Sequence, residues 1–334
     1  MEDLIAQTFR SKHVLVAGAS GFIGTNLVKK LLSLGATVTG TYYENKNFFR
    51  HPNCKYIQAN LEDKDSAFEV TKDADYVFMC AANTSGAAII DKNPLIHLTP
   101  NVIMNARMLE AAYSNDVEKF CFISSNTVYP LTNSPVLESD VNYEFFHKYQ
   151  IVGWMKLFSE KMCKMYSEFV EYPMDTVIVR PGNIYGPFDK FDQNKSKVIA
   201  ALIRRAVEKE DPFEVWGDGK DVKDFIFIDD FITGMVAGFA HFGWGEEVNV
   251  ASGRAVTIKE IIETIFELEE LHNVELKFDP TKPTMIPKRL INIDKLQKHT
   301  GFSPQIDMRE GLSRTIDWYK KYFSEKTPEE LYRA

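Results

Sequence analysis

Cysteines are scarce in this sequence, and no two of them form a C-x-x-C pair. The 334 residues include only four: Cys54, Cys80, Cys121 and Cys163. Cys80 and Cys121 lie inside the apolar runs YVFMC and FCFIS, where a cysteine usually serves as a small buried hydrophobic residue. The spacing therefore predicts neither a disulfide framework nor a metal site.

Long apolar runs and an excess of basic residues are also absent. No stretch of about 18 apolar residues is present, so we expect no membrane-spanning helix. The N-terminal MEDLIAQTF carries acidic residues and no basic segment, which argues against a secretory signal. A formal net charge of −8 and a pI near 5.5 argue against nucleic acid or an anionic membrane as a partner. We therefore expect a cytoplasmic protein.

Short apolar runs alternate with segments of helical spacing in the first half of the chain. HVLVAGAS has the pattern of a buried strand, and FIGTNLVKKLLSLG has the pattern of a helix that ends at a glycine. Further strands are predicted in TVTGTYY, KYIQANL, ADYVFMCAA, KFCFISS and DTVIVRP. Strands that alternate with helices form a parallel sheet covered on both faces. We predict an α/β fold with a Rossmann-type, doubly wound parallel sheet.

The alternation ends near residue 186, where GPFDKFDQNKSK is polar and rich in turn residues. Short strands mixed with helices such as TIKEIIETIFELEE follow and predict a smaller α/β lobe. A chain of 334 residues is also longer than one core usually supports. We predict a first domain over 1–185, with returning segments near 224–252, and a C-terminal lobe mainly over 186–334.

A glycine-rich turn joins the first predicted strand to the first helix. Gly18, Gly21 and Gly24 are spaced G-x-x-G-x-x-G in VAGASGFIGTNLV. The first glycine permits a tight turn, the second admits a pyrophosphate, and the third lets helix and strand pack closely. The helix N-terminus then binds the phosphates. The alternative is a set of glycines that serves the turn only, but the strand–turn–helix context favours dinucleotide binding.

The end of the second predicted strand bears on the choice between NAD and NADP. NAD-specific folds place an acidic residue there for the ribose 2′-hydroxyl, and this sequence has Tyr42. Glu44 follows two residues later, and Lys46 and Arg50 are close enough to meet a 2′-phosphate. The sequence favours NADP over NAD, with the alternative that Lys46 and Arg50 are ordinary surface charges.

Several motifs in order resemble a known family. The glycine turn is followed by MCAANTSGA, SNDVEKFCFISSNTVYP, VIVRPGNIYGPFDKF, SKVIAALIRRA and FEVWGDGKDVKDFIFIDD. Together they resemble the extended short-chain dehydrogenases/reductases that act on nucleotide sugars, the NAD-dependent epimerase/dehydratase family. Within it the chain is most similar to the GDP-L-fucose synthase-like enzymes, and the resemblance covers nearly its whole length.

The resemblance implies a dinucleotide cofactor, NADP or NAD, in the first domain and a nucleotide sugar in the C-terminal lobe. It also implies the cofactor contacts. These are Gly18, Ser20, Gly21, Phe22, Ile23, Gly24, Tyr42, Asn60, Leu61, Cys80, Ala81, Ala82, Lys156 and Pro181.

The resemblance further implies a hydride transfer at a sugar carbon. In this family a serine and a tyrosine bind the sugar oxygen, and a lysine four residues after the tyrosine holds the nicotinamide ribose. The serine corresponds to Ser125 and the lysine to Lys156, but the tyrosine position is Val152. A cysteine and a histidine used in epimerisation correspond to Thr127 and Lys197. The residues that handle protons are thus changed together.

Four candidates for the proton chemistry remain open. Tyr149 precedes Val152 by about one helical turn, although it can equally pack in the core. Lys197 in a closed cleft can act as an acid or a base, or it can bind phosphate or remain solvated. Ser125 can relay a proton through water or ribose. The fourth alternative is that no proton is transferred, because valine neither donates nor accepts one.

The resemblance also implies the contacts to the nucleotide sugar. Lys223 takes the place of the family's arginine at the diphosphate and, as a point charge, would hold it less firmly. Trp216 resembles an aromatic residue beside the base. The full set is Ser85, Asn183, Lys197, Trp216, Lys223, Lys288 and Arg289. Each of these can alternatively be a surface charge or a core residue.

Two functions follow from these features. The first is an NAD(P)-dependent nucleotide-sugar oxidoreductase or epimerase acting at the sugar C4 region, with a GDP-sugar preferred and an atypical acid–base residue. The second is a catalytically degenerate protein that binds dinucleotide and nucleotide sugar. NVIMNARMLEAAY and VGWMKLFSEKMCKMY also carry apolar stripes that predict a homodimer through a four-helix bundle, unless those stripes face the sheet only.

Overall fold

A seven-stranded parallel sheet dominates the structure. The computed structural model describes the chain except for residues 47–48, 85–92, 193–195, 283 and 326–334. The strand order is β10-β6-β5-β4-β1-β2-β3, which confirms the predicted doubly wound sheet. The strands are β1 His13–Ala17, β2 Thr37–Tyr42, β3 Cys54–Gln58, β4 Tyr76–Met79, β5 Lys119–Ile123, β6 Asp175–Pro181 and β10 Glu246–Val250.

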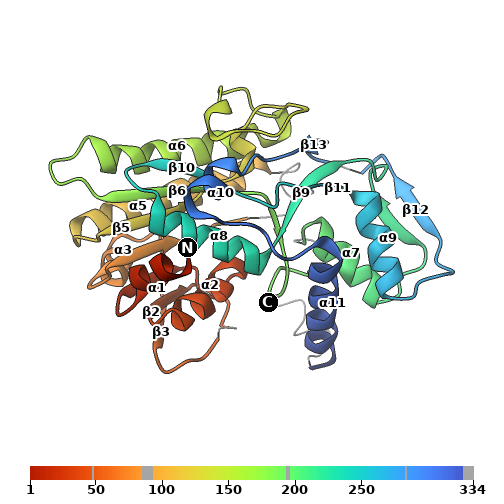
Figure 1. Cartoon of the computed structure of the whole chain (residues 1–334), viewed down its shortest axis with the longest axis horizontal. Coiled ribbons are helices and arrows are strands. Elements are labelled where there is room, and N and C mark those ends of the chain that lie inside the picture. The colour runs from red at the N-terminus through yellow and green to blue at the C-terminus, as the bar shows by residue number, and fades with distance from the viewer. Residues whose placement is uncertain (47–48, 85–92, 193–195, 283, 326–334) are drawn as a thin grey trace.

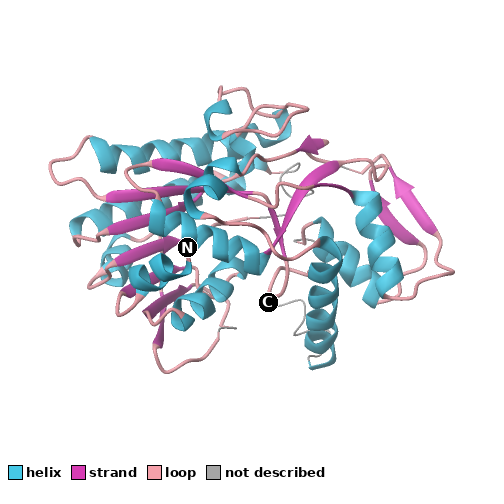
Figure 2. Ribbon diagram, in the orientation of Figure 1, coloured by secondary structure: helices cyan, strands magenta, loops and turns pink. Residues whose placement is uncertain are grey.

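Helices cover both faces of this sheet, as Figure 2 shows. On one face lie α1 Glu2–Phe9, α2 Phe22–Ser33 and α8 Ile228–His241, and on the other lie α3 Lys64–Thr71, α5 Thr99–Ser114 and α6 Gln150–Glu168. Side chains of each strand alternate between the two layers. Along β1, for example, Val14 and Val16 belong to one buried cluster, and Leu15 and Ala17 belong to the other.

A smaller lobe lies to the right of the large sheet in Figure 1. Two small sheets form it, one around β9 Val222–Phe227 and one pairing β8 Phe213–Trp216 with β12 Leu276–Asp279. The strands around β9 are β7 Asn183–Tyr185, β11 Ala255–Thr257 and β13 Lys288–Arg289. The helices of this lobe are α7 Val198–Val207, α9 Ile258–Leu268 and α11 Met308–Glu325, whereas α10 Asp294–Thr300 packs against α8 and β10 of the main sheet.

The chain passes between the two parts more than once. β9 belongs to the smaller lobe and leads directly into α8 beneath the main sheet. β10 then pairs with β6 and forms the edge of that sheet. The chain between β9 and β10 thus returns to the main sheet and its covering helices. The division of the chain into two domains at residue 185 stays a prediction. In the described part of the chain, no helix is both long and apolar enough to cross a membrane.

Candidate active site

The glycine turn lies between β1 and α2, beside the segment that follows β4. Gly18 has a φ of +79°, and a Cβ there would lie 2.7 Å from the Ala81 Cα. A side chain at Gly24 would overlap the Gly18 carbonyl. The neighbouring strands β1 and β4 are where the strand order reverses, which is where ligands bind in open α/β sheets. The turn therefore forms a cradle that only glycine permits, as a pyrophosphate at the N-terminus of α2 requires.

The other predicted cofactor residues lie at the same edge of the sheet. Tyr42 ends β2, Pro181 ends β6, and Asn60 and Leu61 follow β3. Asn45 donates a hydrogen bond from Nδ2 to the Ser20 carbonyl at 3.1 Å, which ties the segment after β2 to the glycine turn. The structure thus brings both sides of an expected adenosine site together, although the individual contacts to a cofactor stay predictions.

Ser125 follows β5 and caps the short 3₁₀ helix η2 Asn126–Val128. Its Oγ accepts the Thr127 N–H at 3.2 Å and the Thr127 hydroxyl at 3.0 Å. A hydroxyl has two acceptor positions and one proton to donate. Because Thr127 supplies both donors, the proton of Ser125 is left to donate to a further acceptor, such as a sugar oxygen.

Helix α6 packs directly on this serine turn. A Cβ at Gly153 would lie 3.0 Å from the Thr127 carbonyl oxygen and 2.7 Å from the Phe145 ring, so glycine permits the close approach. Lys156, three residues later, donates from Nζ to the Ile123 carbonyl at 2.7 Å. Burial lowers the pKa of Lys156 to about 8, and the charge of Glu160 opposes that shift.

The residues considered for proton transfer differ in burial and in position. Val152 is half-buried on α6, one turn before Lys156. Tyr149 ends the 3₁₀ helix η4 His147–Tyr149, and burial raises its pKa to about 12, which makes it a poor acid near neutral pH. Lys197 is exposed at the N-cap of α7, in the smaller lobe. Of these candidates, Ser125 is hydrogen-bonded to Thr127, the residue at the position of the family's cysteine.

The predicted substrate residues lie mainly around β9. Lys223 pairs with Asp221 at 3.0 Å, and Asn183 donates to the Asp224 carbonyl at 2.9 Å. Trp216 is 39% exposed at the end of β8. Lys288 of β13 lies opposite Val222 of β9. Ser85 lies outside the described residues.

Arg289, predicted as a contact to the nucleotide sugar, is a buried residue rather than a surface charge. It donates to the backbone carbonyls of Tyr129, at 3.0 Å, and Pro130, at 2.8 Å. Its Nε has no hydrogen-bond partner among the described residues, and burial lowers its pKa to about 10. Its bonds hold the segment that follows Ser125, while a role in substrate binding stays a prediction.

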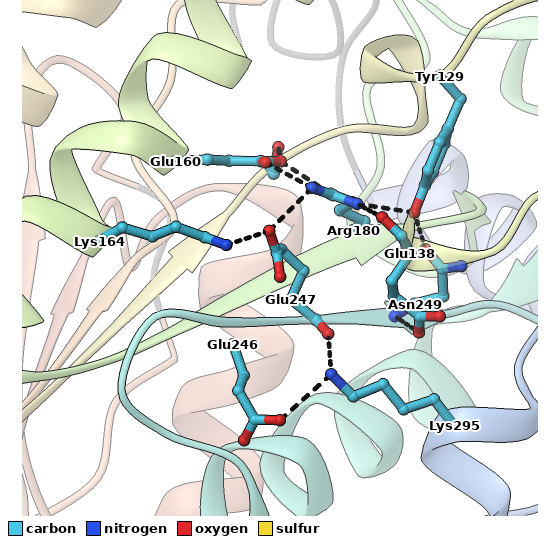
Figure 3. A network of polar contacts seen from close by, with 10 residues as sticks. Tyr129, Glu138, Glu160, Lys164, Arg180, Glu246, Glu247, Asn249 and Lys295 are labelled. Atoms are coloured by element: carbon cyan, nitrogen blue, oxygen red, sulfur yellow. Dashed lines mark hydrogen bonds and ion pairs between the residues drawn. The ribbon is translucent and has the colours of Figure 1, made fainter. Parts of the chain in front are cut away.

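Sequence reasoning missed a buried ionic network behind the serine (Figure 3). Arg180 of β6 donates to Glu160 of α6 twice, at 3.0 Å from Nε and 2.7 Å from Nη2. The Ser124 hydroxyl donates to the same carboxylate at 2.5 Å. Arg180 also donates to the Tyr129 hydroxyl at 3.2 Å. One signal was available, because Glu160 falls four residues after Lys156 and thus on its helical face.

Comparison with known proteins gives consistent matches. Residues 14–251 match the NAD dependent epimerase/dehydratase family. GDP-L-fucose synthase 1 of Arabidopsis thaliana is 29% identical over 327 residues, covering 96% of each chain. GDP-mannose 3,5-epimerase 1 of Oryza sativa subsp. indica is also 29% identical, covering 94% of this chain and 84% of that protein. The solved structure of epimerase Mth375 from Methanothermobacter thermautotrophicus superposes with a TM-score of 0.87 at 28% identity, covering 97% of this chain and 96% of the other.

Proposed function

The chain belongs to the NAD dependent epimerase/dehydratase family, and within it we propose an enzyme that moves a hydride at the C4 region of a GDP-linked sugar. The predicted resemblance to nucleotide-sugar epimerases and reductases is confirmed by the family match and by both groups of relatives. The GDP preference, the position of the hydride and the atypical acid–base residue are the proposed parts.

The hydrogen bonding of Ser125 carries the proposal. Both of its acceptor positions are filled by Thr127, so its proton can serve a sugar oxygen. Lys156 lies against the same strand end, where an ammonium can hold a ribose hydroxyl. NAD(P), when bound, supplies the nicotinamide that accepts or donates the hydride. The protein residues orient the two reactants, and such positioning alone accelerates a reaction substantially.

The nucleotide and the cofactor are inferred from different observations. GDP is proposed because relatives that match over nearly the full length act, by name, on GDP-sugars. NADP is proposed over NAD because no acid stands at Tyr42, where the 2′-hydroxyl partner is expected, while Lys46 and Arg50 follow. Titrating the protein with NADPH and NADH separately tests this choice, and tighter binding of NADH would contradict it.

A protein that binds both ligands without chemistry is the second candidate, favoured by Val152 alone. The test supplies NAD⁺ or NADP⁺ with GDP-mannose, GDP-L-fucose or UDP-glucose and follows the absorbance of reduced nicotinamide. The reverse arm supplies reduced cofactor with the corresponding 4-keto sugars. We expect turnover with a GDP-sugar, abolished in Ser125→Ala. Because an epimerase returns the hydride to the sugar, the sugar products are analysed as well. If all combinations bind with neither a change in absorbance nor a new sugar product, the second candidate holds.

We also propose a cytoplasmic homodimer assembled through α5 and α6. Trp154 and Phe158 are 47% and 49% exposed on α6, although both are large and apolar. Exposed apolar residues continue along the chain through Met165, Phe169 and Tyr172, and Ile103 adds one from α5. Trp154, Phe158 and Met165 share one face of α6 by their spacing, and an exposed apolar face of this kind marks an interaction site. A second copy of the same two helices would complete a four-helix bundle.

A further inference from the structure

We propose that Lys156 itself donates and accepts the proton of the hydride step, and that Glu160 is the residue that positions and tunes it. The proposal rests on the proposed function, since it concerns the same sugar oxygen. It assigns to the lysine the task that a tyrosine at position 152 would otherwise have.

Two consecutive residues at the end of β5 are held by one face of α6. Lys156 donates to the carbonyl of Ile123 at 2.7 Å, and Glu160 accepts the hydroxyl of Ser124 at 2.5 Å. Lys156 and Glu160 are four residues apart, so they project from the same side of the helix. Ser125 directly follows Ser124 in the chain. The helix thus fixes the serine and the ammonium relative to each other.

The donor count of Lys156 leaves room for a substrate. An ammonium has three N–H groups, and the carbonyl of Ile123 takes one. The remaining two can serve a ribose hydroxyl and the sugar oxygen together. Val152 competes for neither, because its side chain has no polar atom.

The charges around Lys156 come from few groups in the described part of the chain. On its own helix, Glu160 and Cys163 favour the charged form. From β6, Arg180 binds Glu160 and reduces its net effect. From β5 the amine meets the neutral Ile123 carbonyl and, at 4.8 Å from its centroid, the Phe122 ring. Burial outweighs these contacts and lowers the pKa of Lys156 to about 8, so both protonation states are accessible near neutral pH.

The step balances without another reactant. In the oxidising direction the C–H bond at the sugar carbon would break, and a bound NAD(P) would supply the nicotinamide that accepts its hydride. The O–H bond of the same carbon breaks, and its proton goes to the neutral amine of Lys156. The products are a keto sugar, a reduced nicotinamide and an ammonium. In the reducing direction the ammonium returns the proton to the oxygen.

The test measures the pH profile of the hydride step with GDP-L-fucose in Glu160→Gln. Glutamine keeps an oxygen for Ser124 but removes the negative charge that stabilises the ammonium. We expect the inflection of the wild-type protein, near pH 8, to move down by about one unit. Glu247→Gln is the matched control, because Glu247 lies 3.5 Å from the same Arg180 but is not among the groups that act on Lys156. We expect its inflection to remain in place.

Lys156→Arg keeps the test decisive if Glu160→Gln folds poorly. Arginine remains charged at every working pH, so it can donate to the carbonyl and the ribose but cannot exchange a proton. We expect NADPH binding to persist, the inflection to vanish, and the hydride step to slow by about 10²–10⁴-fold. A wild-type rate and profile in Lys156→Arg would overturn the inference while leaving the proposed function intact. Absence of hydride transfer in the wild-type protein itself would remove both.

Discussion

Replacing Arg180 by methionine is the sharpest test of the buried network. The side chains of Arg180 and Glu160 are only 2% and 1% exposed. Methionine fills much of the arginine volume but removes both bonds to the carboxylate. Glu160 would then keep the Ser124 hydroxyl as its partner and lose its counter-charge. Removing one partner of a buried pair usually costs about 3–5 kcal/mol in the free energy of unfolding.

The surroundings of Arg180 place the expected cost at the lower end of this range. A cavity of about 370 Å³ is lined by Arg180, Glu138, Lys161 and Glu247, together with four further residues. Its volume and its charged lining residues allow water to enter beside the position that Arg180 occupies. We therefore expect about 3 kcal/mol for Arg180→Met, and no more than that for Glu160→Met, because the guanidinium keeps Glu247 as an ion-pair partner at 3.5 Å.

Urea unfolding followed by tryptophan fluorescence measures both costs in the free energy of unfolding. The double variant shows whether these costs come from the pairing of the two residues. Glu160→Met/Arg180→Met removes both charges together, so it should cost less than either single change. The slope against urea must stay constant for the comparison to hold. A double variant that costs the sum of the two single ones would refute the reasoning, because the residues would then act independently. So would single costs below about 1 kcal/mol, the usual value of an exposed pair.

Three further predictions concern the cofactor, the assembly and the missing phenol. Gly18→Ala should abolish NADPH binding, measured by fluorescence titration, because its backbone has a φ of +79° and its Cβ would meet the chain after β4. Trp154→Glu should convert a dimer into a monomer, because it buries a charge in the proposed bundle. Sedimentation velocity measures this change, and an unchanged sedimentation coefficient would place the interface elsewhere. Val152→Tyr in a Lys156→Arg background should restore the hydride step at least about tenfold by supplying a new acid, and no recovery would count against the assigned alignment of α6.

The fold could be predicted because its signals are local. The glycine turn stands between an apolar strand and an amphipathic helix, and that order alone defines the first unit of the sheet. Ser125 and Lys156 were assigned from the family motifs around them, and their roles in catalysis stay predictions. Lys156 lies in α6, which begins at Gln150. The apolar spacing of this segment indicates a helix, so the residues that share a helix face with Lys156 could be named from the sequence.

The partners of Glu160 in the ionic network could not be predicted, because they meet it only through the tertiary structure. Glu160 stands in KLFSEKMCKMYSE, where charged residues alternate with apolar ones and a glutamate normally faces solvent. Arg180 lies in β6, twenty residues later in the chain, and only the packing of α6 on β6 brings the two together. The same limit applies to Arg289, whose bonds to Tyr129 and Pro130 join residues that are 160 and 159 positions apart.

In the proposed site, Val152 at the position of the family's tyrosine would change the role of Lys156. Beside a tyrosine, a lysine acts best when it stays charged, because a fixed cation lowers the pKa of the phenol. Without one, a permanently charged lysine can only bind, and a proton must come from a group that titrates near the working pH. Burial supplies that property by destabilising the ammonium, and Glu160 limits the shift so that the charged form remains available. The pairing of Glu160 with Arg180 then has a consequence for chemistry as well as stability, because the guanidinium determines how much of the carboxylate's charge reaches Lys156.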